Sequence, residues 1–237
     1  MSCSPHQCSV KSAVGLSILN CNFVDIKRQL AELIESGIDF IHLDVMDGNF
    51  VDDITFGPAF VKSLIDEFPG QKWEVHMMVN RPNQFIKPMS NAGVHRYIFH
   101  YEVTTDFDGK SGQYSTNQLI DTIHDHRMEA SVAINPSTPV EPILKYLDQV
   151  ESVLIMTVVP GLGGQRFDHT MMVKVETIRS NRPKMDIELD GGVGPNVVEL
   201  CGKSGANRIV CGTALLRSTQ KSADVLQMRR SLFPIES

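Results

Sequence analysis

The 237-residue chain lacks the apolar run of about 18 residues that a membrane-spanning helix needs. Its opening, MSCSPHQCSVKSAVGLSIL, has no apolar stretch leading to a small-residue cleavage site, so we expect no secretory signal. A basic surplus is also missing. The 22 Lys and Arg stand against 28 Asp and Glu, giving a net charge of −6, which argues against nonspecific nucleic-acid binding. We therefore expect a cytoplasmic protein whose partner is neither a membrane nor a nucleic acid.

Cysteines are few and scattered. The chain has five cysteines, Cys3, Cys8, Cys21, Cys201 and Cys211. Because their number is odd and none forms a CxxC pair, we expect reduced thiols and no disulfide framework. The first two fall in residues 1–11, which we expect to form an N-terminal tail. A metal clip of Cys3 and Cys8 alone is disfavoured, because a four-ligand site needs further ligands nearby.

The chain instead has a repeated alternation between short runs rich in Val, Ile and Phe and amphipathic stretches of helical period. We predict strands at 13–19, 38–45, 73–79, 96–100, 129–134, 151–158, 185–189 and 207–211. We predict helices at 24–36, 58–67, from Pro82 onward, and at 117–127, 139–148, 170–181, 195–204 and 220–232. The polar segment 101–116 is predicted to be a mobile surface loop. Eight units without a linker, over residues 12–237, predict an α/β protein with a single (β/α)8 TIM barrel; an open doubly wound sheet is the alternative.

Polar side chains gather where several predicted strands end. His42 and Asp44 are two apart on one strand and so share a face. His76 and Asp190 stand near the ends of two other strands. Each alone is more typical of a hydrogen-bonded core histidine or a capping aspartate. In a barrel all four converge at one mouth, and that set favours one divalent ion, with Zn²⁺, Fe²⁺, Mn²⁺ and Co²⁺ all chemically suitable.

Glycine-rich turns follow the last three predicted strands. Gly191, Gly192 and Gly194 follow the seventh strand, and Gly212 and Thr213 follow the eighth. Barrels commonly bind phosphate with these two loops, although each motif alone is only a tight turn. The sixth strand is followed by 160–165 (PGLGGQ), a loop that could close over a substrate or merely be flexible.

The sequence resembles the ribulose-phosphate 3-epimerase family from about residue 12 to 225. The matching segments are SIL (17–19), HLDVMDGNFVDDITFGP (42–58), VHMMV (75–79), FHYE (99–102), NPSTP (135–139), MTVVPGLGGQRF (156–167), MMVKVETIR (171–179), ELDGGVG (188–194) and GAN, IV and GTA within 205–214. The joint occurrence of DVMDG, HMMV, MTVxPGxGGQ and DGGVG is highly specific.

The resemblance implies interconversion of D-ribulose 5-phosphate and D-xylulose 5-phosphate in the pentose phosphate pathway, with one divalent metal ion and a homodimeric assembly. It implies His42, Asp44, His76 and Asp190 as metal ligands and Asp44 and Asp190 as the acid/base pair. The substrate-binding positions it implies are Ser17, Met46, His76, Met78, Met156, Gly161, Gly163, Gly164, Asp190, Gly191, Gly192, Gly212 and Thr213. The three methionines are strand-end residues that, without the resemblance, could equally be core filler.

The implied chemistry suits these residues. Inverting a carbon beside a ketone requires a proton to leave one face and another to reach the opposite face, which two carboxylates can do. The enediolate formed between these steps carries negative charge that a metal ion stabilises.

Three residues depart from the family pattern: Leu16 for a usual Pro, Asn49 for a frequent His and Leu162 for a frequent Phe. They bear on substrate fit, so a ketohexose-phosphate (allulose-6-phosphate) 3-epimerase and a non-catalytic phosphosugar-binding barrel remain alternatives. A phosphosugar decarboxylase is disfavoured. Its Asp-x-Lys-x-x-Asp motif has only a partial match at Asp25–Lys27, in a predicted helix.

Overall fold

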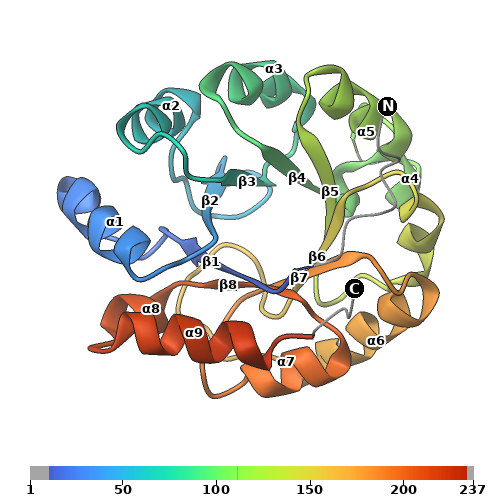
Figure 1. The fold of residues 1–237 in the computed structure, drawn as a ribbon. Coiled ribbons are helices and arrows are strands. Elements are labelled where there is room, and N and C mark those ends of the chain that lie inside the picture. Colours follow the sequence, from blue (N-terminus) through green and yellow to red (C-terminus); the bar gives the residue numbers. More distant parts are fainter. Residues whose placement is uncertain (1–10, 111, 234–237) are drawn as a thin grey trace, which may run out of the picture.

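Eight parallel strands hydrogen-bond in chain order, and β8 pairs with β1 to close the ring (Figure 1). The computed structural model describes residues 11–110 and 112–233. The strands are β1 Ala13–Ser17, β2 Phe40–Met46, β3 Trp73–Met78, β4 Arg96–His100, β5 Glu129–Ile134, β6 Ser152–Met156, β7 Asp186–Asp190 and β8 Arg208–Cys211. The predicted TIM barrel is confirmed, and the open doubly wound sheet is excluded.

Helices surround the barrel and cover its outer face (Figure 1). The principal ones are α1 Ile26–Glu35, α2 Pro58–Glu67, α3 Asn83–Ala92, α5 Thr116–Asp125, α6 Met172–Asn181, α7 Val198–Ser204 and α9 Lys221–Ser231, with short 3₁₀ turns η2 Phe23–Asp25 and η5 His169–Met171. Local sequence sets several of their ends. Gly37 ends α1 with φ +86° while its amide donates to the Ile34 carbonyl, and Ser115 begins α5 in a capping box with Gln118.

Two predictions of local structure are wrong. The predicted helix 139–148 is a shorter 3₁₀ helix, η4 Glu141–Tyr146, in a segment where Pro139 and Pro142 have no amide proton to donate. Segment 101–116 is not a loop throughout, since it begins with η3 Tyr101–Val103 and α4 Thr105–Asp108. Tyr101 and Val103 are buried there, so apolar packing orders a segment whose composition is mainly polar. The short helix α8, Thr213–Arg217, was not predicted.

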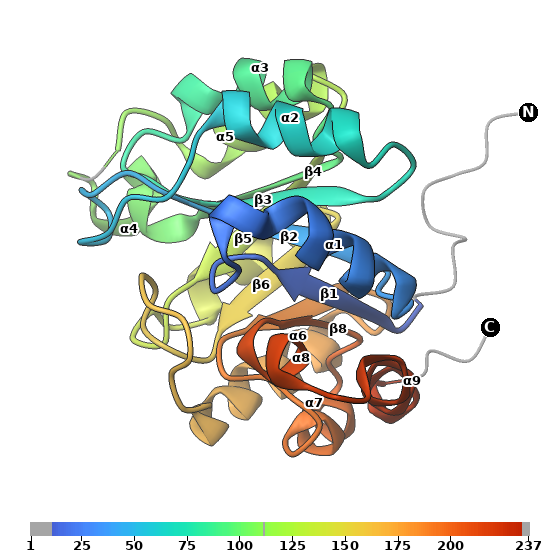
Figure 2. The ribbon, with the colours of Figure 1, turned by 90° about the vertical axis from the view of Figure 1, so that its left-hand side faces the viewer.

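The barrel interior is unusually polar. On β2, Ile41, Leu43 and Val45 join the apolar layer beneath the helices, while His42 and Asp44 alternate with them on the opposite face and point inside. The loop after β2, α4 and the loop after β6 project at one end of the barrel, at the left in Figure 2. This is the end at which the strands finish, so the polar interior opens there.

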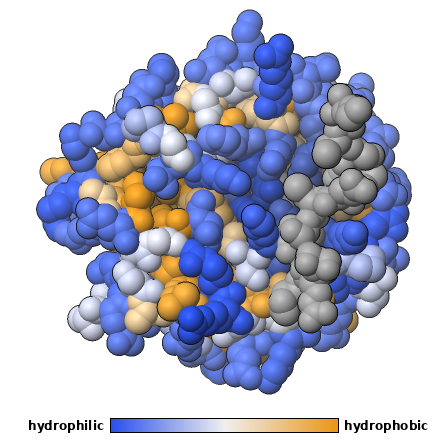
Figure 3. Space-filling view, in the orientation of Figure 1, coloured by the Kyte–Doolittle hydropathy of each residue, from blue (hydrophilic) through white to orange (hydrophobic). Residues whose placement is uncertain are grey.

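Polar side chains dominate the face seen in Figure 3, while apolar ones show beside α1 and α2. Among the described helices, none is both long enough and apolar enough to cross a membrane. Cys21, Cys201 and Cys211 are buried free thiols, whereas Cys3 and Cys8 lie outside the described residues.

Candidate metal and active site

The four predicted metal ligands meet at the mouth of the barrel. His42 and Asp44 come from β2, His76 from β3 and Asp190 from the end of β7. One candidate ligand atom from each lies within 4.8 Å of every other, a spacing that fits one ion bound by two imidazoles and two carboxylates. We call these four residues the mouth cluster. The residues pair as neighbours across strands, because β2 and β3 align Asp44 with His76.

His42 offers the clearest sign that this cluster fits a cation. Its Nε2 is buried without a hydrogen-bond partner, 3.4 Å from Asp44 Oδ1 and 3.9 Å from Asp190 Oδ2. A buried polar atom without a partner is costly. On its other side, His42 Nδ1 lies 2.7 Å from Glu74 Oε1, which leaves Nε2 as the atom available to a metal.

His76 faces the mouth cluster with Nδ1, whereas His42 faces it with Nε2. Its Nδ1 lies 3.3 Å from Asp44 Oδ1 and 3.6 Å from Asp190 Oδ2, and its Nε2 lies 2.8 Å from Nε2 of His100. The side chains of His76, His100 and Asp44 are almost fully buried, and that of Asp190 is partly exposed. Burial lowers the pKa of His76 to about 4, so its imidazole is neutral and suited to ligation.

The two aspartates of the cluster have opposite electrostatic surroundings. Burial would raise the pKa of Asp44, but the charge of His42 and hydrogen bonds from His42 and His76 hold it well below its usual range. Ser17 Oγ also donates to Asp44 Oδ2 at 2.6 Å. Burial, reinforced by repulsion from Asp44, raises the pKa of Asp190. The pair is therefore biased toward one ionised and one protonated carboxyl group, as an acid/base pair requires.

A second charged group lies beneath the mouth cluster, further inside the barrel. Glu74 and Glu188 are both buried, and Arg208 donates to each, at 2.8 Å and 2.7 Å respectively. The Arg96 Nη1 atom lies 3.8 Å from Glu74 and 3.7 Å from Glu188. We call these four residues the lower cluster. Its carboxylates already have two permanent cations beside them.

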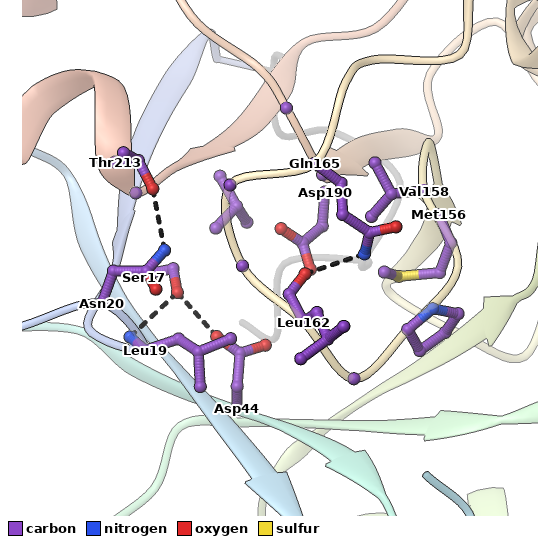
Figure 4. Close-up of a pocket in the computed structure, with 18 of the residues that line it drawn as sticks. Ser17, Leu19, Asn20, Asp44, Met156, Val158, Leu162, Gln165, Asp190 and Thr213 are labelled. Carbon is purple, nitrogen blue, oxygen red and sulfur yellow. Dashed lines mark hydrogen bonds between the residues drawn. The ribbon is translucent and has the colours of Figure 1, made fainter. Parts of the chain in front are cut away.

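A pocket opens above Asp44 and Asp190 (Figure 4). Twelve of the thirteen predicted substrate-binding residues line it: Ser17, Met46, Met78, Met156, Gly161, Gly163, Gly164, Asp190, Gly191, Gly192, Gly212 and Thr213. His76 does not line the pocket, because its side chain is fully buried below the opening. The position of His76 therefore suits a metal ligand better than a residue that contacts the substrate.

The glycine loops enclose one side of this pocket. Gly192 has φ +65°, and a Cβ atom there would lie 2.6 Å from the Phe167 amide nitrogen, so no side chain fits. At Gly212 a Cβ atom would meet nothing closer than 3.6 Å, so its absence leaves open space in the pocket. Gln165 Nε2 donates to the carbonyls of Val159 and Leu162, which holds the loop after β6 in a folded form.

Sequence reasoning missed several residues of the site. Asn20 lines the pocket and donates from Nδ2 to Thr213 Oγ1 at 2.8 Å, joining the loops after β1 and β8 (Figure 4). Glu74 and His100 were also missed. His100 ends β4, so the strand-end rule used for the metal ligands points to it, whereas Glu74 lies near the start of β3 and shares only the face of His76.

The three departures from the family pattern differ in position. Leu16 belongs to the apolar layer outside the strands, and Asn49 caps the turn after β2, donating to the Asp47 carbonyl. Only Leu162 lines the pocket. A change in substrate fit would therefore come through Leu162.

A closed barrel with acidic and imidazole side chains at the ends of its strands has the architecture of the (β/α)8-barrel enzymes. Within that class, residues 13–216 match the model of the ribulose-phosphate 3 epimerase family, and the chain belongs to that family.

Named relatives agree with this assignment over nearly the whole chain. The cytoplasmic isoform of ribulose-phosphate 3-epimerase from Oryza sativa subsp. japonica is 34% identical over 222 residues, covering 92% of this chain and 93% of the relative. The Schizosaccharomyces pombe enzyme is 32% identical, covering 94% and 95% respectively. The Bacillus subtilis enzyme is 32% identical, covering 92% and 98%.

Solved structures with low identity share the fold. A 3-hexulose-6-phosphate synthase has a TM-score of 0.67 at 12% identity, covering 93% of this chain and 99% of its own. KGPDC from Streptococcus mutans in complex with D-R5P has a TM-score of 0.67 at 11% identity, covering 93% and 96%. At this identity the likeness concerns the barrel alone.

Proposed function

We propose that this chain interconverts D-ribulose 5-phosphate and D-xylulose 5-phosphate by proton transfer at carbon 3. The observation that carries the proposal is the Asp44–Asp190 pair. Two carboxyl groups with ligand oxygens within 4.8 Å of one another lie at the floor of one pocket, one with a lowered and the other with a raised pKa. Family membership and relatives named ribulose-phosphate 3-epimerase support the same activity.

The two aspartates act from opposite faces of the sugar carbon. The ionised carboxylate removes the proton from one face, and the protonated partner delivers a proton to the other. Each turnover exchanges the protonation states of the pair, so the reverse reaction begins with the opposite assignment. Ser17 and the two histidines hold Asp44 in place for this transfer. A divalent ion held by His42, Asp44, His76 and Asp190 would supply positive charge to the enediolate oxygens.

The rest of the pocket binds the substrate away from the reacting carbon. Met46, Met78 and Met156 form an apolar wall beside the aspartates. We assign the phosphate to the loops after β7 and β8, where Gly191, Gly192, Gly212 and Thr213 leave backbone groups accessible. Phosphate held there orients the sugar above the carboxylates.

We further propose one Fe²⁺, Zn²⁺, Mn²⁺ or Co²⁺ ion per chain, a cytoplasmic location and a homodimer. The ligand set accepts each of these metals. The buried free thiols and the rice relative's name support the location. Exposed Phe23 and Val24, 41% and 97% accessible, leave apolar surface suited to a second copy of the chain, which sedimentation velocity would detect.

The deciding experiment compares turnover of ribulose 5-phosphate and allulose 6-phosphate by the purified protein, before and after metal removal. We expect kcat/KM to favour ribulose 5-phosphate. Preference for allulose 6-phosphate would assign the chain to the ketohexose-phosphate reaction instead. Binding of either sugar without turnover by the metal-loaded protein would support the non-catalytic alternative.

A further inference from the structure

A line of buried hydrogen-bonding groups leads away from the mouth cluster on the His76 side. His76 Nε2 meets His100 Nε2 at 2.8 Å, and His100 Nδ1 meets Glu102 Oε2 at 3.0 Å. His76 and His100 are fully buried, and the side chain of Glu102 is 9% exposed. None of these contacts is part of the acid/base chemistry described above.

The pairing of donors with acceptors determines which ring nitrogens of His76 and His100 carry protons. Two imidazole nitrogens 2.8 Å apart require one donor and one acceptor. Glu102 as a carboxylate only accepts, and the hydrogen bonds it receives from His100, the Asn135 amide and Thr138 keep its pKa low despite burial. His100 must then donate from Nδ1 to Glu102, which leaves its Nε2 as an acceptor. His76 must donate from Nε2, so the lone pair on its Nδ1 faces Asp44 and Asp190.

Glu102 is itself held in one orientation. Its other oxygen, Oε1, accepts from the Asn135 amide at 2.7 Å and from the Thr138 hydroxyl. Lys174, from α6, fixes the loop that supplies these donors by bonding to the carbonyls of Asn135, Pro136 and Thr138 at 3.0, 2.8 and 2.6 Å. Phe50 covers His100, with the ring centroids 4.6 Å apart. The line therefore ends on a rigid support.

We propose that His100 and Glu102 are positioning residues that set the tautomer of His76 and so present its Nδ1 to the divalent ion. This proposal rests on the metal site of the proposed function. It gives the two histidine ligands different supports: His42 is held directly by Glu74, whereas His76 is held by a carboxylate acting through a second imidazole.

Glu102→Gln tests the proposal sharply. The Asn135 amide proton is fixed, so the oxygen of the new side-chain amide must face it and the NH₂ group must face His100. That NH₂ group donates to His100 Nδ1 and moves the imidazole proton to Nε2. His76 Nε2 must then accept, and its proton moves to Nδ1, where it occupies the position of the metal ligand.

We would measure Zn²⁺ affinity of chelator-treated protein by competition with a chromophoric chelator, without sugar present, and histidine tautomers by ¹⁵N NMR. Glu102→Gln and His100→Phe should each weaken Zn²⁺ binding 10- to 100-fold, the range usual for such supports. His100→Gln, which keeps an acceptor for His76, should recover most of the affinity. Glu151→Gln is the matched control, because Glu151 pairs with His124 at 3.1 Å on the surface, and should bind as wild type.

Wild-type Zn²⁺ affinity in Glu102→Gln protein, or a wild-type spectrum showing His76 protonated at Nδ1, would overturn the proposal. Equal losses in His100→Gln and His100→Phe would also overturn it, because they would indicate packing instead of a hydrogen bond. Since no sugar is present, a failure of the proposed epimerase activity would leave these outcomes unchanged.

Discussion

The mouth cluster and the lower cluster each place two carboxyl groups inside the barrel, yet they differ in the cations beside them. In the lower cluster, Arg208 bonds to both Glu74 and Glu188. In the mouth cluster, the basic groups beside Asp44 and Asp190 are histidines, and Nε2 of His42 has no hydrogen-bond partner. Arg96 Nη1 and Glu188 Oε1 of the lower cluster also lack hydrogen-bond partners, but guanidinium groups already balance its carboxylates, whereas the mouth group has room for an added cation and a transferable proton. This difference separates a structural ionic cluster from a reactive one.

The largest effect on activity is expected from neutralising the two carboxyl groups of the mouth cluster. Asp44→Asn and Asp190→Asn keep the shape of the side chain but cannot take a proton at neutral pH. We expect each to reduce epimerisation at least about 10²-fold. In D₂O, each metal-loaded variant should exchange the carbon 3 proton of one epimer for deuterium without inverting it. One variant should label ribulose 5-phosphate and the other xylulose 5-phosphate. Exchange into the same epimer by both variants, or epimerisation at the wild-type rate by either, would rule out the two-base mechanism.

Removing the permanent cation of the lower cluster should instead affect folding. Arg208→Met leaves Glu74 and Glu188 buried without their principal partner, a change that costs about 3–5 kcal/mol in comparable buried pairs. Chemical denaturation would measure this loss in the free energy of unfolding. Arg182→Met is the control, since the Arg182–Asp148 pair is exposed and such pairs contribute at most about 1 kcal/mol. Equal losses at the two sites would show that the lower cluster has no special structural role.

Substrate binding should respond to the open space at Gly212. Gly212→Val would place methyl groups in the phosphate region, where a Cβ atom has no neighbour closer than 3.6 Å, and we expect about a tenfold rise in KM, equivalent to about 1.4 kcal/mol. Steady-state kinetics would measure it. Gly57→Val, at a position with nothing within 4 Å of a Cβ atom and outside the pocket, should leave KM unchanged.

Free ribulose should react far more slowly than ribulose 5-phosphate, because the remote phosphate orients the reacting centre. Equal kcat/KM values for the two sugars would contradict the assignment of the phosphate to these loops.

The smallest expected effect separates the two aspartates by the sign of their contribution to stability. In metal-free protein, the Asp190 pKa is raised to about 7, so between about pH 4 and pH 7 the folded state binds more protons than the unfolded state and stability falls as pH rises. Asp190→Asn should therefore stabilise metal-free protein by about 1 kcal/mol at pH 8 and by less at pH 5. Asp44 has a lowered pKa and stabilises the fold above pH 4, so Asp44→Asn should lower the melting temperature at pH 8. Thermal unfolding with a chelator present measures both, and equal signs would contradict the assigned electrostatics.

Much of this fold is predictable from the chain because each strand–helix unit has its own local signal. The strands at 96–100 and 129–134 and the helix at 58–67 lie where periodicity places them. The two errors have different causes: segment 139–148, which contains Pro139 and Pro142, forms only a short 3₁₀ helix, and buried Tyr101 and Val103 order segment 101–116 despite its polar composition.

The candidate site is predictable in part for the same reason. Strand-end position brings His42, Asp44, His76 and Asp190 together once the barrel closes. The supporting roles of Glu74, His100 and Glu102 were not evident from sequence, because each role depends on which ring nitrogen a histidine turns toward its partner. That orientation depends on side-chain geometry that residue spacing does not fix.

The most direct test of the central claim is metal content measured together with turnover of ribulose 5-phosphate. We predict one divalent ion per chain in active protein, loss of activity on chelation, and recovery in proportion to the Zn²⁺, Co²⁺, Mn²⁺ or Fe²⁺ bound. His76→Ala should fold normally and lose metal affinity, while the lower cluster binds no second ion. Full activity in protein shown by elemental analysis to be metal-free would contradict the account.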